Sequence, residues 1–528
     1  MEKVFIYDTT LRDGAQAEGI SFTDKGKIRF ALMLDDMGVD FIEGGFAGSN
    51  SRDRKFFEDI RREKLNHARI VAFGSTRRFD MDVADDPQLQ GLLAADTEWV
   101  TIYGKSWLLH VKDVLRTSAE NNLQMIADTV GHLKTGGRNV IFDAEHFYDG
   151  YKNNAEYALK ALDAAVREGA SSVVLCDTNG GTMPHEAYEI TRAVCKRFPE
   201  LEVGVHTHND SGLAVAVSLE AVRAGARHVQ GTINGYGERT GNGNLITILP
   251  SLELKMGMHC VGPDNLKKLY KVSVIADDLT NQLGDSRRPF VGRSSFSHKA
   301  GAHVNAVQKN TASFEHIDPV AVGNKRHILV SELSGGSNVK VKARELGIDV
   351  SCMTKSQIAA VLAAVKEKET EGYSYESADG SFKILLHKVL DQHRPFFELQ
   401  GFRCIVEKRG PEEPCITEAT VKIRVKGETE LMAGEGDGPV DALNKALRKA
   451  LIRFYPEIDN VSLTDYRVRI LDPKNATSAV TRVQIESGDG QRNWGTVGVS
   501  ENIIEASWQA LVDSVEVKLY EAEEQKQQ

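Results

Sequence analysis

Residues 203–210 read V-G-V-H-T-H-N-D, a short apolar run that ends in two histidines, an asparagine and an aspartate. If the run is a strand, His206 and His208 point to the same face, because strand side chains alternate. Two imidazoles on one face, followed by an amide and a carboxylate, can hold a divalent metal ion. A solvated turn with two ordinary histidines fits the same letters, so the interpretation depends on the rest of the chain.

Seven other short apolar runs accompany this stretch, and segments of helical periodicity separate them. The eight runs are residues 4–7, 39–42, 70–73, 99–103, 140–142, 173–176, 203–205 and 228–233. Strands that alternate with helices indicate parallel β/α units, and eight units in about 250 residues are typical of a (β/α)₈ TIM barrel. An open doubly wound sheet is the alternative fold, but no G-x-G-x-x-G motif follows the first run to support it.

Polar residues and glycines follow all eight runs, and in a barrel this is the face where catalytic sites are built. Closing the barrel places the first strand beside the eighth and the eighth beside the seventh. We therefore expect Asp13, after the first run, to meet His206, His208 and Asn242. Such a set suits Mg²⁺, Mn²⁺ or Zn²⁺. The other interpretation of Asp13 is that it only pairs with Arg12 or caps a helix.

A metal site with open positions can chelate a 2-oxo acid through its carboxylate and keto oxygens and polarise the ketone. Arg12 is placed to stabilise negative charge that develops on oxygen, unless it forms only a structural salt bridge. Thr178, after the sixth run, can donate a hydrogen bond to the substrate carboxylate. Its alternative role is a turn hydroxyl that bonds the backbone.

The pattern changes after the predicted barrel, which we place at residues 1–260. Residues 261–395 show helical segments around a polar stretch and are predicted to be helical linker subdomains, with a mobile connection at 366–380. From residue 396 the chain is rich in predicted strands, and a weak repeat leads twice through glycines into a helix, at 441–452 and 503–517. We interpret residues 396–520 as an α+β domain of repeated βββα units, followed by a solvated tail at 521–528.

Composition narrows the class of protein. Hydrophobic residues make up 41% and charged residues 27% of the 528 residues, as in ordinary soluble proteins. The formal net charge of −10 argues against nucleic acid as the main partner. Six cysteines without a C-x-x-C pair fit a reducing cytoplasm. The chain shows no signal peptide and no apolar run of about 20 residues, so no membrane association is expected.

Three motifs carry a resemblance to a known family. D-T-T-L-R-D-G-A-Q at 8–16, H-T-H-N-D at 206–210 and G-E-R-T-G-N at 237–242 resemble the 2-isopropylmalate, homocitrate and citramalate synthases, which are metal-dependent barrel enzymes. The C-terminal repeat is similar to the regulatory domain of the 2-isopropylmalate and citramalate synthases. The stretches that look most like the citramalate synthase branch are 42–50, 73–78, 175–182 and 244–257.

The resemblance implies an acyltransferase that condenses acetyl-CoA with pyruvate and water to (R)-citramalate and CoA, in isoleucine biosynthesis. It implies a divalent metal, acetyl-CoA as cosubstrate, a homodimer, and feedback by an amino acid, isoleucine by analogy, through the C-terminal domain. Site roles are carried over motif by motif: Asp13, His206, His208 and Asn242 for metal binding, Arg12, Gln16 and Thr178 for substrate binding, and Arg12, Glu145 and His303 for catalysis. His303 matches a catalytic histidine that lies in the linker region of relatives. In those relatives the histidine reaches the active site of the other subunit of the dimer.

Three residues depart from the family pattern. Relatives often carry tyrosine where Phe314 stands. Phenylalanine lacks the phenolic hydroxyl, so any role of that hydroxyl in proton transfer is absent here or is filled by water or His316. Thr240 stands where this branch often has cysteine, and Ala47 where it often has proline. All three changes bear on the choice of substrate.

Three other activities fit the same barrel. A sister synthase would use another 2-oxo acid, as 2-isopropylmalate and homocitrate synthases do. A lyase or aldolase would cleave the carbon–carbon bond in place of forming it, but the long C-terminal domain and the G-S-N stretch at 48–50 argue against this activity. A non-catalytic metabolite sensor is supported only by Phe314 and opposed by the metal set and Arg12.

Overall fold

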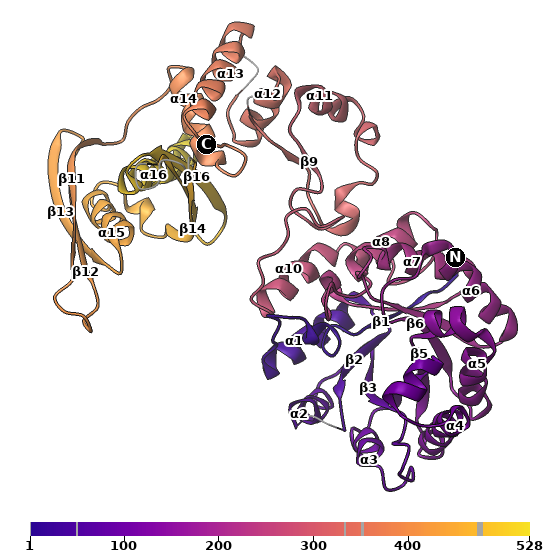
Figure 1. Cartoon of the computed structure of the whole chain (residues 1–528). Helices are drawn as coiled ribbons and strands as arrows, with labels where there is room; N and C mark the ends of the chain where they lie inside the picture. Colours follow the sequence, from indigo (N-terminus) through magenta and orange to yellow (C-terminus); the bar gives the residue numbers. More distant parts are fainter. Residues whose placement is uncertain (1, 49–50, 332–333, 350–352, 472–478, 528) are drawn as a thin grey trace. The chain divides into compact units, whose positions relative to one another are not determined.

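The computed structural model describes residues 2–48, 51–331, 334–349, 353–471 and 479–527. The chain forms two compact units, which are described separately here. The first holds Met1–Phe296 with Ile317–Lys325, and the second holds Ser297–His316 with Arg326–Gln528. Both units are drawn in Figure 1.

Eight parallel strands close into a barrel in the first unit (Figure 1). They are β1 (Phe5–Asp8), β2 (Phe41–Phe46), β3 (Arg69–Ser75), β4 (Trp99–Lys105), β5 (Asn139–Glu145), β6 (Ser172–Asp177), β7 (Glu202–Thr207) and β8 (His228–Gly231). β1 and β8 pair in parallel, with Phe5 opposite His228 and Asp8 opposite Gly231. This pairing closes the barrel, so the predicted TIM barrel is confirmed and the open sheet is excluded.

Helices surround the barrel. They are α1 (Asp24–Met37), α2 (Ser51–Ile60), α3 (Pro87–Ala94), α4 (Ala119–Thr135), α5 (Phe147–Arg167), α6 (Pro184–Arg197), α7 (Ala214–Ala224) and α8 (Leu245–Leu254). Local chemistry sets the ends of α1. The side chain of Thr23 accepts a hydrogen bond from the backbone N–H of Gly26, and Gly38 ends the helix in the left-handed region at φ 83°. The buried face includes Phe30 and Leu34, which have no exposed surface, and each contributes about 1.5–3 kcal/mol by leaving water.

Two further helices pack on the barrel. These are α9 (Pro263–Leu266) and α10 (Leu269–Leu279). Leu266, Leu269 and Val272 are buried in the barrel's hydrophobic core. The predicted boundary at residue 260 therefore falls before two helices that the contacts assign to the barrel unit, because their apolar faces are buried in its core.

The second unit begins with a small helical region. Its elements are β9 (Ser297–His298), α11 (Gly301–Lys309), β10 (His327–Ile328), α12 (Gly336–Glu345), α13 (Lys355–Thr370) and α14 (Asp379–Val389). We expected a mobile connection at 366–380, and this differs from the structure. α13 extends to Thr370, and Tyr375 and Ala378 are buried in one cluster with Phe382, so the connection is packed.

Two βββα units complete the chain, as predicted from the repeat. The first comprises β11 (Glu398–Glu407), β12 (Ile416–Val425), β13 (Glu428–Gly436) and α15 (Pro439–Leu451), and the second β14 (Ser462–Ile470), β15 (Thr481–Gly488), β16 (Asn493–Ser500) and α16 (Ile503–Gln527). Both sheets are antiparallel. The prediction of a solvated tail is wrong, because α16 continues through these residues. Glu524 forms an ion pair with Lys383, and Lys526 forms one with Glu457.

Within the described ranges of the chain, no helix combines the length and apolar character needed to cross a membrane.

Candidate metal centre and active site

Asp13, His206 and His208 lie together at the C-terminal ends of the barrel strands. Their ligand atoms all lie within 4.8 Å of one another. Oδ2 of Asp13 is 3.3 Å from Nε2 of His206 and 3.9 Å from Nε2 of His208, and the two Nε2 atoms are 3.2 Å apart. β1 ends at Asp8, so Asp13 lies in the loop that follows the strand and precedes a short 3₁₀ helix, Gly14–Gln16.

Asn242 adjoins this cluster through a backbone bridge with His208. Its Nδ2 lies 3.0 Å from Oδ2 of Asp13 and 3.3 Å from Nε2 of His206, while its Oδ1 is buried without a hydrogen-bond partner. The two ends of a carboxamide have the same shape, so the same side chain can turn its oxygen towards a cation. A buried oxygen without a partner at this position fits a fourth ligand.

The charge states of His208 and Asp13 also suit metal binding. Burial lowers the pKa of His208 to about 3, with His206 adding to the effect, which keeps its imidazole neutral. Burial acts to raise the pKa of Asp13, but Arg12 and His206 hold it well below its usual range, so the carboxylate stays charged. Neutral imidazole and ionised carboxylate are the forms that bind divalent ions. The residues present therefore fit a divalent metal.

Gln230 and Asp143 support the cluster from inside the barrel, and the sequence reasoning missed both. Oε1 of Gln230, on β8, lies 2.8 Å from Nδ1 of His206. Nε2 of Gln230 donates to Oδ1 of Asp143, on β5, at 3.0 Å. An acceptor at Nδ1 places the ring proton there and leaves the Nε2 lone pair facing Asp13 and His208. Burial raises the pKa of Asp143 to about 7.

Arg12 forms a salt bridge, as one interpretation predicted, and it also faces the cluster of candidate metal ligands. Its Nε donates to Oε2 of Glu43 at 2.5 Å, and its Nη1 lies 3.4 Å from Oδ2 of Asp13. The guanidinium carbon is 3.7 Å from the ring centre of Phe73. Glu43, on β2, is completely buried and also accepts a hydrogen bond from the hydroxyl of Tyr7 at 2.6 Å. Glu43 was not predicted as a site residue.

Thr178 and Glu145 lie at the ends of neighbouring strands. Oγ1 of Thr178, which follows β6, accepts a hydrogen bond from the backbone N–H of His146 at 2.9 Å, as the turn interpretation expected. The hydroxyl proton of Thr178 is not used in that bond. Glu145, the last residue of β5, forms an ion pair with Lys105, the last residue of β4. Lys105 is a further residue that the motifs did not indicate.

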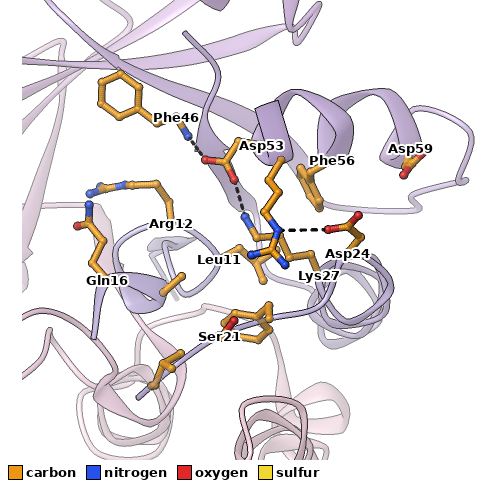
Figure 2. A pocket seen from close by; sticks show the side chains of 14 residues that line it. Leu11, Arg12, Gln16, Ser21, Asp24, Lys27, Phe46, Asp53, Phe56 and Asp59 are labelled. Carbon is orange, nitrogen blue, oxygen red and sulfur yellow. Dashed lines mark hydrogen bonds and ion pairs between the residues drawn. The ribbon is translucent and has the colours of Figure 1, made fainter. Parts of the chain in front are cut away.

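Gln16 lines a pocket of about 340 Å³ beside Arg12. The loop after β1, the start of α1, the end of β2 and helix α2 form its walls (Figure 2). Figure 2 shows Arg12 and Gln16 near each other at one end and Lys27 with Asp53 towards the other. Nζ of Lys27 donates to Oδ1 of Asp53 at 2.7 Å. The pocket thus extends from Arg12 away from the barrel axis.

His303 lies in the second unit, on α11. Its ring centre is 4.2 Å from that of Phe314, whose side chain is 49% exposed. The approach of His303 to the barrel site stays a prediction. Of the other departures, Ala47 is buried after β2 and Thr240 is exposed in the loop after β8. Ser49 and Asn50, which belong to the motif at 42–50, lie outside the described residues.

The closed barrel and its ligand cluster define an HMGL-like barrel protein with a candidate metal centre, and a family model described as HMGL-like matches residues 3–275. Two further models match later parts of the chain: "Homocitrate synthase post-HMGL domain-like" at 290–372 and "LeuA allosteric (dimerisation) domain" at 376–519. The chain belongs to the (R)-citramalate synthase family, as its full-length relatives show. The resemblance found in the motifs is therefore confirmed.

Three relatives illustrate this membership. (R)-Citramalate synthases of Aquifex aeolicus and Geobacter sulfurreducens are each 50% identical over 524 residues, which is 99% of this chain and 99% of either relative. A 2-isopropylmalate synthase of Methanocaldococcus jannaschii is 31% identical over 519 residues, 97% of this chain and 94% of its own.

Proposed function

We propose that this chain condenses acetyl-CoA with pyruvate and water to give (R)-citramalate and CoA. The observation that carries the proposal is the meeting of Asp13, His206 and His208 beside Arg12 in a chain that matches (R)-citramalate synthases along its whole length. Five relatives that are 45–50% identical over nearly the whole chain are all (R)-citramalate synthases, which favours pyruvate as the 2-oxo acid. The C-terminal βββα units favour a synthase over a lyase of the same barrel class.

Asp13, His206 and His208, with Asn242, would hold a Mg²⁺, Mn²⁺ or Zn²⁺ ion. Such an ion, when bound, supplies Lewis-acid polarisation of the 2-oxo group. The neutral His208 and the ionised Asp13 present lone pairs to one point, and Gln230 fixes the ring of His206. The protein thus provides an organised ligand set without moving these side chains.

Arg12 stabilises the oxygen that gains negative charge when the new carbon–carbon bond forms. Glu43 and the ring of Phe73 restrict the guanidinium to one orientation, so little reorganisation is needed during the reaction. Thr178 donates a hydrogen bond from its hydroxyl to the pyruvate carboxylate. Gln16 lies on the pocket side of Arg12 and contacts the substrate, and Lys105 fixes the carboxylate of Glu145 near it.

His303 is the base that removes a proton from the acetyl methyl group. The resulting enolate carbon attacks the ketone carbon of pyruvate, and the ketone oxygen takes up a proton. Water then cleaves the thioester and releases CoA, so the product carries two carboxylates. Phe314 packs against His303 but offers no hydroxyl, so any relay of the proton passes through water or His316.

The LeuA-type domain supports two further parts of the proposal. The chain acts as a homodimer, and isoleucine, the end product of the pathway that citramalate would feed, inhibits it through this domain. The described cysteines, which are all free, fit a place in the cytoplasm. Deletion of the residues after 395 should abolish inhibition by isoleucine, and an unchanged inhibition curve would refute this part.

The direct test measures free thiol released from acetyl-CoA by the purified protein. We expect release with pyruvate, little with 2-oxoisovalerate or 2-oxoglutarate, and none from Asp13→Ala. Glu156→Gln, at an exposed position of α5, serves as the control and should keep full activity. Release with another 2-oxo acid only would assign a sister synthase, and cleavage of citramalyl-CoA without condensation would assign a lyase.

A further inference from the structure

Arg239 lies in the loop after β8, and its side chain bonds the loops that follow β6 and β7. Its Nε and Nη2 donate to the two carboxylate oxygens of Asp210 at 2.7 and 2.9 Å. Nη2 also donates to the backbone carbonyl of Thr178 at 2.7 Å. A planar guanidinium that bonds both oxygens of a carboxylate and a carbonyl is fixed in direction, which the single ammonium of lysine does not achieve.

The backbone of Arg239 has an unfavourable conformation. Its φ is 57°, in the left-handed region that residues with a side chain rarely adopt. Two backbone hydrogen bonds hold the loop in this form. The N–H of Gly241 donates to the carbonyl of Glu238 at 3.0 Å, and the N–H of Asn209 donates to the carbonyl of Gly241 at 2.8 Å. The loop therefore keeps a strained residue whose side chain connects two other loops.

The loops after β6 and β7 also approach each other closely. Gly180 has φ 61°, and a Cβ atom at this position would lie 2.5 Å from Oδ2 of Asp210. The backbone N–H and the hydroxyl of Ser211 both donate to the carbonyl of Gly180, at 3.1 and 2.6 Å. The carboxylate of Asp210 thus contacts both Arg239 and the loop that carries Thr178.

These contacts hold Thr178 on two sides. Its Oγ1 accepts from the backbone N–H of His146, and its carbonyl accepts from Arg239. Neither bond uses the hydroxyl proton, which remains free to be donated to a ligand. A donor that is already oriented binds a substrate carboxylate with a smaller loss of conformational entropy.

We propose that Arg239 is a positioning residue for the carboxylate of the 2-oxo acid. It acts through Thr178, and Asp210 keeps its guanidinium in place. The inference rests on the proposed function, in which Thr178 donates to that carboxylate, and it names a residue on which this contact depends. Two clustered metal ligands have other supports, Gln230 and Arg12, so a change at Arg239 should leave metal binding intact.

Steady-state thiol assays with pyruvate test the proposal. In Arg239→Gln we expect KM for pyruvate to rise by about tenfold and kcat to change by less than about threefold, because one oriented hydrogen bond to the substrate is weakened. Asp210→Asn keeps the bond from Arg239 to Thr178 and should raise KM less. Arg197→Gln is the matched control, because Arg197 donates to both oxygens of Asp163 in the same way, between α6 and α5. Its KM should equal that of the wild type.

Combination with Thr178→Val separates positioning from a general structural effect. Valine has nearly the same shape as threonine but no hydroxyl, so this change alone should raise KM. Adding Arg239→Gln should then raise KM little further, because the group that it positions is already absent. Full additivity of the two changes would overturn the inference, as would a loss of metal affinity in Arg239→Gln, measured by competition with a chelator.

Hydrogen exchange tests the same contact without catalysis. The N–H groups of Gly180 and Thr182 donate to the carbonyl and the carboxylate of Asp177, so both are protected while the loop is ordered. The peptide that contains them should exchange faster in Arg239→Gln than in the wild type or the control. Unchanged exchange, with normal turnover by the wild type, would refute the inference alone. If the wild type released no thiol with any 2-oxo acid, the proposed function would fail, and the substrate role of Arg239 with it.

Discussion

Nε of Arg12 lies 2.5 Å from Oε2 of Glu43, and this ion pair directs the guanidinium towards the metal ligands. Glu43 is completely buried and its other oxygen accepts from Tyr7, so the carboxylate has little freedom. Nη1 of Arg12 remains 3.4 Å from Asp13. The salt bridge and the proposed catalytic role, which the sequence presented as alternatives, are therefore compatible in one arrangement.

Glu43→Gln tests this arrangement. The amide keeps the shape of the side chain and can still accept from Tyr7, but it loses the charge that orients Arg12. We expect kcat to fall by about tenfold to a hundredfold, with a smaller change in KM for pyruvate. A misoriented Arg12 weakens the interaction with the transition state more than it weakens the binding of the substrate. Steady-state thiol assays measure this. Glu58→Gln, on the exposed face of α2, is the control, and a parallel loss of bound metal in Glu43→Gln would contradict a role through Arg12.

Gln230→Leu tests whether Gln230 orients the ring of His206. Leucine cannot accept from Nδ1 of His206 and leaves Oδ1 of Asp143 without its donor. We expect the affinity for Mn²⁺ or Zn²⁺ to fall by about tenfold to a hundredfold, as is typical when a ligand's outer partner is removed. Competition with a chromogenic chelator gives the affinity directly. Circular dichroism serves as the folding control, and an unchanged affinity in a folded variant would mean that Gln230 does not orient the ligand.

Removal of the metal should affect stability as well as activity. An ion that binds only the folded chain raises the melting temperature, so a chelator should lower it and added Mg²⁺, Mn²⁺ or Zn²⁺ should restore it. In His208→Ala, which lacks one of the three clustered ligands, the chelator should cause little further change. His185→Ala, on the exposed surface of α6, should respond like the wild type. An equal chelator effect in His208→Ala would place the ion elsewhere.

The barrel and its ligand cluster could be predicted because both follow from spacing. Eight apolar runs with helices between them specify a closed sheet, and closure brings the loop after β1, which carries Asp13, near the end of β7, where His206 and His208 lie. Glu43, Asp143 and Gln230 could not be found in this way. Each of them lies inside or beside an apolar run. A single polar residue in such a run does not indicate which other strand its side chain will contact. The three residues lie on three different strands, β2, β5 and β8, so only the closed register brings them to their partners.

The C-terminal helix shows a different limit. E-A-E-E-Q-K-Q-Q is polar throughout, and polarity alone suggested a solvated tail. Glutamate, glutamine, lysine and alanine are nevertheless strong helix formers, so the sequence can continue α16. Ion pairs of Glu524 with Lys383 and of Lys526 with Glu457 connect its last turns to other elements. These contacts join residues far apart in the chain, and no local pattern contains them.

His387 of α14 provides a test of pH dependence outside the metal site. Its ring stacks on that of Tyr520, with centres 4.3 Å apart, and both ring nitrogens are buried without a hydrogen-bond partner. Burial lowers the pKa of His387 to about 4, with Lys383 and His393 adding to the effect and Glu524 opposing it. Histidine in the unfolded chain has a pKa of about 6.5. The neutral ring of His387 therefore makes its full contribution to the stability of the folded state above that pH. It is lost as the pH falls towards 4, because the unfolded state binds the proton first.

His387→Phe should therefore weaken the acid sensitivity of the second unit. Phenylalanine retains the ring stack on Tyr520 but cannot bind a proton, so the penalty for burying a titratable ring disappears. Between pH 7 and pH 5 the melting temperature of the variant should fall less than that of the wild type, in parallel thermal scans. His185→Phe changes an exposed histidine on α6 and should follow the wild type. If His387→Phe and the wild type lose the same stability over this range, protonation of the buried ring does not govern the acid response.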